Sequence, residues 1–194
     1  MTRNTAAFTA ALLLLCLRPL AGQPAEAFSI LDVQAAGVLN VDSGELGDLW
    51  RSRHGFLVRL ATPFYIGTGA IAVQQTGFGG RRPDRPDFRM RTATAEWNVD
   101  GQFSRGVRGF AGVHAGSTGM SFLDAEHLSD NTEENEFVAG IQGGASLRLS
   151  GGLAATAIAS HRKVFTRHPL RLTFLTLGLG YSFATPRALR AFLE

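Results

Sequence analysis

A serine next to a histidine is the first place in this sequence where residue types and spacing suggest chemistry. The segment is Ser160-His161-Arg162-Lys163, in a stretch that alternates like a β-strand. A hydroxyl nucleophile needs a histidine base within hydrogen-bond reach. Adjacent residues of a strand point to opposite faces, so Ser160 and His161 are not expected to form such a pair. We therefore expect no catalytic residues and no enzyme activity.

Basic residues near this segment favour a second kind of chemistry, the binding of phosphate. Arginine pairs with phosphate through two parallel hydrogen bonds. His161, Arg162 and Lys163, with Arg167 and His168, predict a cationic rim, and a Pro/Gly-rich segment at 77–87 adds three arginines. As contacts for lipopolysaccharide phosphates we expect Arg81, Arg82, Arg85, Arg162, Lys163 and Arg167. The alternative is that these side chains are only solvated.

Carboxylates gather in residues 124–136, where calcium would find suitable oxygen ligands. The segment lacks the ligand spacing and the turn glycine of an EF-hand loop. We therefore expect a solvated loop, with no metal and no cofactor.

The N-terminal residues follow the layout of a secretory signal peptide. Arg3 precedes a nearly wholly apolar run over residues 6–17, and small residues follow it. Ala25-Glu26-Ala27 has small residues at the two positions that signal peptidase reads, so cleavage is expected after Ala27, with Gly22 as the alternative. The apolar run is too short for a membrane helix, which needs about 20 residues. The sequence thus predicts export, with a signal peptide over 1–27.

The composition excludes several classes of protein. Cys16 is the only cysteine and lies in the signal segment, and Leu15 before it does not fit a lipoprotein signal. The mature chain therefore has no thiol for a disulfide or a metal site. A net charge of +3, almost all from arginine, makes no case for nucleic-acid binding.

Eight segments of the remaining chain alternate apolar and polar residues, the pattern of half-buried strands. They span residues 28–40, 54–62, 65–76, 88–99, 106–116, 136–149, 153–163 and 170–183. The clearest is 88–99, in which Ala95 and Trp97 share one face and Thr94 and Glu96 the other. The connections alternate between long, such as 41–53 and 117–135, and short, such as the turn at Asp100-Gly101. Outer-membrane barrels obey this rule, with short turns in the periplasm and long loops outside.

Charges are sparse on the polar faces of these segments, which consist mostly of Thr, Ser, Gly, Gln and Asn. A soluble barrel would present a charged face to water. An eight-stranded barrel has an interior just wide enough to be filled by side chains, where each charge needs a partner. We expect a lumenal ion network formed by Glu96, Arg108, Glu136 and Arg148.

The closing segment, 176–183, has a wholly apolar outward face that ends in two aromatic residues one pleat apart. Thr176, Gly178, Tyr181 and Phe183 match the polar-x-Gly-x-x-aromatic-x-aromatic assembly signal of bacterial outer-membrane barrels, although 11 residues follow Phe183. On this motif and the strand pattern the chain resembles the small eight-stranded outer-membrane barrels of the OmpA/OmpX-like superfamily. Some barrels of this size are lipid A deacylases with a His-x-Ser-Asn motif, but Lys163 stands where their serine would be.

The resemblance implies an all-β fold, an eight-stranded antiparallel up-and-down transmembrane barrel over 28–183, with a short periplasmic tail over 184–194. It implies a monomer in the Gram-negative outer membrane, with outer-membrane lipids, lipopolysaccharide and the barrel assembly machinery as partners. We expect a narrow or blocked lumen and a structural or surface-contact role. The alternatives are a lipid A-modifying hydrolase and a soluble lipocalin-like periplasmic barrel. The tail is either a short amphipathic helix or disordered.

Overall fold

Eight long antiparallel strands form one closed ring in the computed structural model, which describes residues 27–41, 45–83, 85–123, 133–167 and 169–193. The strands are β1 (Ile30–Asn40), β3 (Gly55–Phe64), β4 (Gly67–Gly80), β5 (Phe88–Ser104), β6 (Val107–Phe122), β7 (Glu133–Ser150), β8 (Leu153–Val164) and β9 (Leu170–Ala184). Each strand pairs with the next in this order, and β9 pairs with β1 from Ile30↔Ala184 to Asn40↔Phe174. The predicted all-β, eight-stranded antiparallel barrel is confirmed.

The connection after β1, predicted as a loop over 41–53, contains regular structure. A one-turn helix, α2 (Glu45–Leu49), leads into a short strand, β2 (Trp50–Ser52). β2 pairs with the end of β4, from Trp50↔Gly80 to Ser52↔Phe78, beyond the last residue that pairs with β3. β2 therefore extends the line of β3 after a break at Arg53 and His54. Leu46 and Trp50 pack on apolar side chains inside the barrel, which gives this segment a reason to be ordered.

The hairpin of β5 and β6 is longer than the sequence pattern predicted. The turn lies at Arg105-Gly106 rather than at Asp100-Gly101, and the strands remain paired through Gln102↔Arg108. Gly106 has a φ of +90°, a conformation that favours glycine. β6 also continues to Phe122, so the loop predicted over 117–135 is shorter at both ends.

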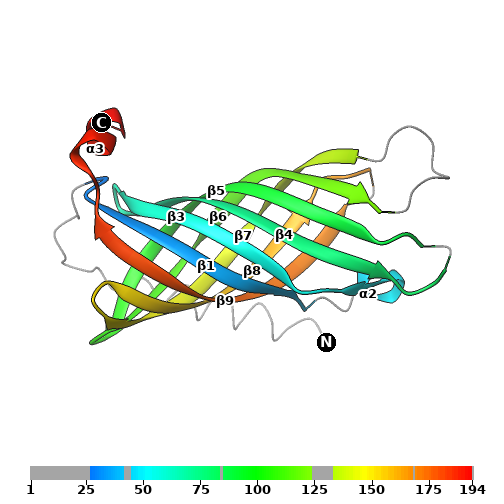
Figure 1. Cartoon of the computed structure of the whole chain (residues 1–194), viewed down its shortest axis with the longest axis horizontal. Coiled ribbons are helices and arrows are strands. Elements are labelled where there is room, and N and C mark those ends of the chain that lie inside the picture. Colours follow the sequence, from blue (N-terminus) through cyan, green and yellow to red (C-terminus); the bar gives the residue numbers. More distant parts are fainter. Residues whose placement is uncertain (1–26, 42–44, 84, 124–132, 168, 194) are drawn as a thin grey trace, which may run out of the picture.

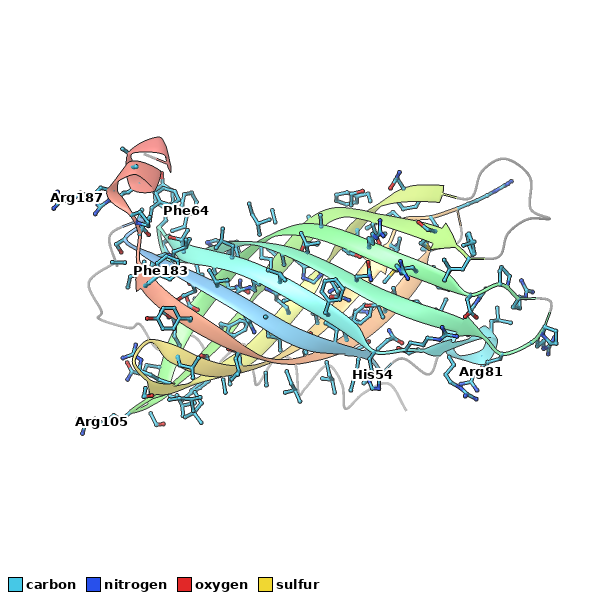
Figure 2. The ribbon with its side chains drawn as sticks, viewed as in Figure 1. His54, Phe64, Arg81, Arg105, Phe183 and Arg187 are labelled. Atoms are coloured by element: carbon cyan, nitrogen blue, oxygen red, sulfur yellow. The ribbon has the colours of Figure 1, made fainter. Side chains whose placement is uncertain are left out.

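The two ends of the barrel differ (Figure 1). The strands run obliquely along the long axis, and α3 (Arg187–Leu193) lies at one end while α2 lies at the other. The labelled side chains of Phe64, Arg105 and Phe183 share the end of the short turns and α3, whereas Arg81 lies at the end of the long connections (Figure 2). For the tail after β9, a short helix and disorder were both predicted, and the structure has the helix. We call these the short-turn end and the long-loop end.

No helix in the described part of the chain is long and apolar enough to cross a membrane. Residues 1–26, which hold nearly all of the predicted signal peptide, and the acidic residues 124–132 lie outside the described residues, as does His168.

Candidate functional site

The strand alternation directs polar side chains into the barrel and apolar side chains away from it. On β5, Thr94, Glu96 and Asn98 are buried, whereas Trp97 between them is exposed. The same alternation runs along β3, where Arg59 is buried between the exposed Val58 and Leu60. The predicted assignment of polar residues to the inside is therefore confirmed for these strands.

An ion pair crosses the middle of the lumen. Arg59 Nε on β3 donates to Glu96 Oε2 on β5 at 2.8 Å, and the two side chains are 10% and 5% exposed. Gln142 Nε2 on β7 donates to the same Glu96 oxygen and to Asn98 Oδ1. Three strands are thus tied together across the barrel, and the carboxylate has a cationic and a neutral donor, as a buried charge requires.

A second buried cation lies one layer closer to the long-loop end. Arg162 on β8 donates from Nη2 to Gln74 Oε1 at 3.0 Å and to Ser160 Oγ at 3.3 Å. Its guanidinium lies 4.5 Å from the centre of the Phe174 ring. The void left between these residues and Glu96 has a volume of only about 10 Å³, room for about one water molecule. The middle of the lumen is therefore filled by side chains.

Apolar side chains fill the lumen towards the long-loop end. Phe174, Leu172, Val38 and Val164 are almost completely inaccessible to solvent. This apolar plug comprises Val38, Leu57, Ala72, Phe78, Phe88, Met90, Met120, Val138, Val164, Leu172 and Phe174. Phe78 and Phe88 stack with ring centroids 4.7 Å apart. The lumen is therefore closed on this side by hydrocarbon. A narrow or blocked lumen was predicted, but its apolar filling was not.

Towards the short-turn end the lumen opens into a polar vestibule of about 600 Å³. Arg108 Nη2 lies 3.1 Å from Asp100 Oδ2 and donates to Thr68 Oγ1 at 3.3 Å. Arg59 and Phe110 form the inner wall of this vestibule. Water can thus reach one side of the central ion pair from the short-turn end.

The four residues predicted to form one lumenal ion network do not pair with one another. Glu96 lies in the centre with Arg59, whereas Arg108 lies in the vestibule with Asp100. Arg148 also lines the vestibule but is exposed. Glu136 lies opposite the buried Thr118 near the long-loop end and is partly exposed. Neither Arg148 nor Glu136 forms an ion pair within the described residues.

The outward cations separate into loop residues and strand residues. Arg81, Arg82, Arg85 and Arg167 are exposed, and Arg85 lies over the Trp50 ring at 5.7 Å. Lys163 is on the outward face of β8. Arg162 must be removed from the predicted set of lipopolysaccharide contacts, because it is 6% exposed and points into the lumen. Strand alternation alone, with Ser160 inward, would have placed it there.

The geometry does not support a Ser160-His161 catalytic pair. Ser160 is buried in the lumen and His161 is exposed on the outer wall. His161 Nδ1 instead lies 3.0 Å from Thr173 Oγ1 of β9. Among the described residues no three His, Cys, Asp or Glu side chains converge where they could hold a metal ion.

The outer wall carries an exposed apolar belt, as a barrel surrounded by lipid does. Ile71 is 63% exposed and Leu177 67%. At the short-turn end Tyr181 and Phe183 of β9 are exposed with their ring centroids 6.2 Å apart. A soluble lipocalin-like barrel would not leave such a belt in water.

No protein-family model matches this sequence, and no characterised protein matches it by sequence. Solved structures do match in shape. Neisserial surface protein A aligns with a TM-score of 0.51 at 15% identity, over 81% of this chain and 96% of its own. The N-terminal barrel of OprF from Pseudomonas aeruginosa aligns at 0.50 and 14%, over 81% and 100%. Ail of Yersinia pestis, in a phospholipid bilayer nanodisc, aligns at 0.51 and 16%, over 80% and 99%. With its closed ring, polar interior and apolar belt, this chain therefore has the fold of the small eight-stranded outer-membrane β-barrels.

Proposed function

We propose that this protein is an integral, non-enzymatic component of the Gram-negative outer membrane whose lumen passes no solute and whose contacts are made at its long-loop end. The exposed apolar belt supports the location, because residues such as Ile71 and Leu177 would be unfavourable in water. The likeness to Neisserial surface protein A and to Ail in a bilayer supports the same location. In this orientation the short turns and α3 face the periplasm.

The apolar plug is the observation that carries the functional part of the proposal. Ions would have to pass a segment of the lumen filled by Phe174, Leu172 and Val38, which are 0 to 1% exposed. The side chains of these three residues offer no oxygen or nitrogen atom to replace an ion's hydration shell. On the long-loop side of the plug, the parts of the molecule left for interaction are the loops and the outer wall.

Two partners follow from the exposed surface. Arg81, Arg82, Arg85, Lys163 and Arg167 would contact the phosphates of lipopolysaccharide, as arginine and lysine bind phosphate. Thr176, Gly178, Tyr181 and Phe183 lie in order on β9, with both aromatic rings exposed. This strand would be the segment that the barrel assembly machinery recognises.

The proposal is tested by two measurements on the full-length chain. Membranes from expressing cells are washed with carbonate, and the protein is expected to stay in the outer-membrane fraction. The purified barrel is then reconstituted into a planar bilayer, where conductance is expected to remain at the baseline. Release by carbonate would contradict the membrane location, and stable single-channel steps would contradict the sealed lumen.

A further inference from the structure

Lys163 and Arg171 form a pair of like charges on the outer wall of the barrel. Lys163 lies directly opposite Arg171 in the register of β8 and β9, and His161 lies opposite Thr173 two residues along. Their neighbours Arg162, Val164 and Leu172 point inward and are buried. Like charges directly opposite each other on one face of a sheet are destabilising. The sheet therefore carries an electrostatic cost here that an anion would relieve.

No carboxylate of the described residues supplies that anion. The ion pairs found are Arg53 with Asp87, Arg59 with Glu96 and Arg108 with Asp100. The ammonium of Lys163 lies 4.9 Å from the centre of the Phe165 ring, which leaves its charge available. Arg171 is exposed. These cations stand on paired strands, so their backbone positions are fixed before any ligand arrives.

The surroundings of this pair are those of a lipid headgroup. Phe165 packs against Phe137 of β7 with ring centroids 5.5 Å apart, and both rings are about half exposed. Ile141, directly opposite His161, and Leu175, one pleat below Thr173, are exposed apolar residues of the belt. Cations and aromatic rings thus meet where the apolar belt ends, which is the depth of the phosphate groups in a leaflet. Aromatic girdles mark the same interface in outer-membrane barrels.

We infer that Lys163, Arg171 and His161 form a binding site for the phosphate of an outer-leaflet lipid, with the apolar belt below them contacting its acyl chains. The guanidinium of Arg171 would pair bidentately with the phosphate and Lys163 would add a point charge. Because Nδ1 of His161 is held by Thr173, its Nε2 is left for the ligand. The inference rests on the proposed location in the outer membrane and adds a defined site to it.

The test measures binding of defined lipids to the full-length barrel in detergent micelles by native mass spectrometry. The probes are bisphosphorylated lipid A, dephosphorylated lipid A with the same acyl chains, and inorganic phosphate. The variant is Lys163→Gln/Arg171→Gln. Its control is Arg105→Gln/Arg187→Gln, which removes the same charge from exposed positions at the short-turn end (Figure 2). For bisphosphorylated lipid A we expect the dissociation constant to rise at least about tenfold in the variant and to stay unchanged in the control.

A third variant keeps the test valid if the double variant folds poorly. Lys163→Glu replaces the repulsion by an ion pair with Arg171, so its thermal midpoint without lipid should not fall, yet bisphosphorylated lipid A should no longer raise it. Unchanged lipid A binding by both variants, or equal binding of the dephosphorylated lipid, would overturn the inference. If inorganic phosphate raised the thermal midpoint as much as bisphosphorylated lipid A does, the site would bind free anions, and the inference that its ligand is a lipid would be overturned. None of these results would release the protein from carbonate-washed membranes or open its lumen. The proposed membrane location and the sealed lumen are therefore tested independently of this site.

Discussion

Glu96 is the residue whose removal should disturb the lumen most. It is the only carboxylate among the residues that line the central void, and it lies between two buried cations. Arg59 is hydrogen-bonded to it directly, and Arg162 lies across the void. The substitution Glu96→Gln preserves the volume of the side chain, so it tests charge rather than packing. Both guanidinium groups would then lack a carboxylate.

The size of the effect follows from burial. Removing one partner of a buried ion pair typically costs about 3 to 5 kcal/mol, since the remaining charge stays desolvated. Arg59 lines the water-accessible vestibule as well, so part of its charge can be solvated from that side. We therefore expect Glu96→Gln to lower the free energy of unfolding by about 3 kcal/mol, at the lower end of that range.

The assay is urea unfolding of the barrel in lipid vesicles, followed by the fluorescence of the two tryptophans, Trp97 on the outward face of β5 and Trp50 on β2. The double variant Glu96→Leu/Arg59→Met replaces the pair by apolar side chains of similar size, and such replacements are often neutral. It should therefore be more stable than Glu96→Gln alone. The reasoning is refuted if the single substitution costs less than about 1 kcal/mol or if the double variant is the less stable of the two.

Three further results are expected in the same unfolding assay. Ile71→Arg puts a cation on the middle of the lipid-facing wall and should lower the free energy of unfolding by about 2 to 4 kcal/mol. Its control, Ile66→Arg in the exposed turn after β3, should lower it by at most about 1 kcal/mol. Equal losses in the two variants would contradict a bilayer around the belt. Phe174→Ala should cost about 3 to 5 kcal/mol through the cavity it leaves, and bilayer recordings should still show no channel because the rest of the plug remains. Gly140→Ala should cost about 1 to 3 kcal/mol, because a Cβ there would overlap the backbone oxygen of His161 and lie 2.7 Å from the ring of the buried His114. Gly143→Ala should be nearly neutral, because a Cβ there would make only an ordinary contact, 3.5 Å from the backbone oxygen of Phe110; similar values for the two would refute the packing argument.

The strands and their two faces could be read from the sequence because a closed barrel imposes a period of two on every strand. Residues 88–99 show this most clearly, with Thr94 and Glu96 inside and Trp97 outside. The turn at Asp100-Gly101 was predicted wrongly for a physical reason. Asp100 is held in a strand by its contacts with Thr68 and Arg108, so the composition of a turn was overridden by tertiary contacts.

The apolar plug escaped prediction because apolar residues were assigned to the lipid face. Met90, Met120 and Phe174 occupy inward positions near the long-loop end, where the alternation is inverted on some strands, as at Met90 between the exposed Arg89 and Arg91. The period of two persists there, but with the apolar residues inside the barrel. The cue in the sequence was this inverted alternation at the strand ends next to the long connections, such as Leu170-Arg171-Leu172.

The partners of the lumenal charges could not be predicted because they depend on the stagger of the closed sheet. Strand patterns show that Arg59, Glu96 and Arg108 point inward, but not their heights along the barrel axis. The register sets those heights, and it brings Arg59 level with Glu96 and leaves Arg108 nearer the short turns with Asp100. Shear in a barrel is a property of the whole ring.

The asymmetry of the lumen determines where this protein can act. In the described residues its polar interior opens through the vestibule beside the short turns, and hydrocarbon closes the other side. Buried cations such as Arg59 and Arg162 are already engaged by Glu96, Gln74 and Ser160. At the long-loop end the charges available to another molecule are therefore those on the outer wall and in the loops. There, Lys163 and Arg171 are the directly opposed cations held by paired strands, which makes the wall of β8 and β9 the place where recognition of a lipid phosphate should first be sought.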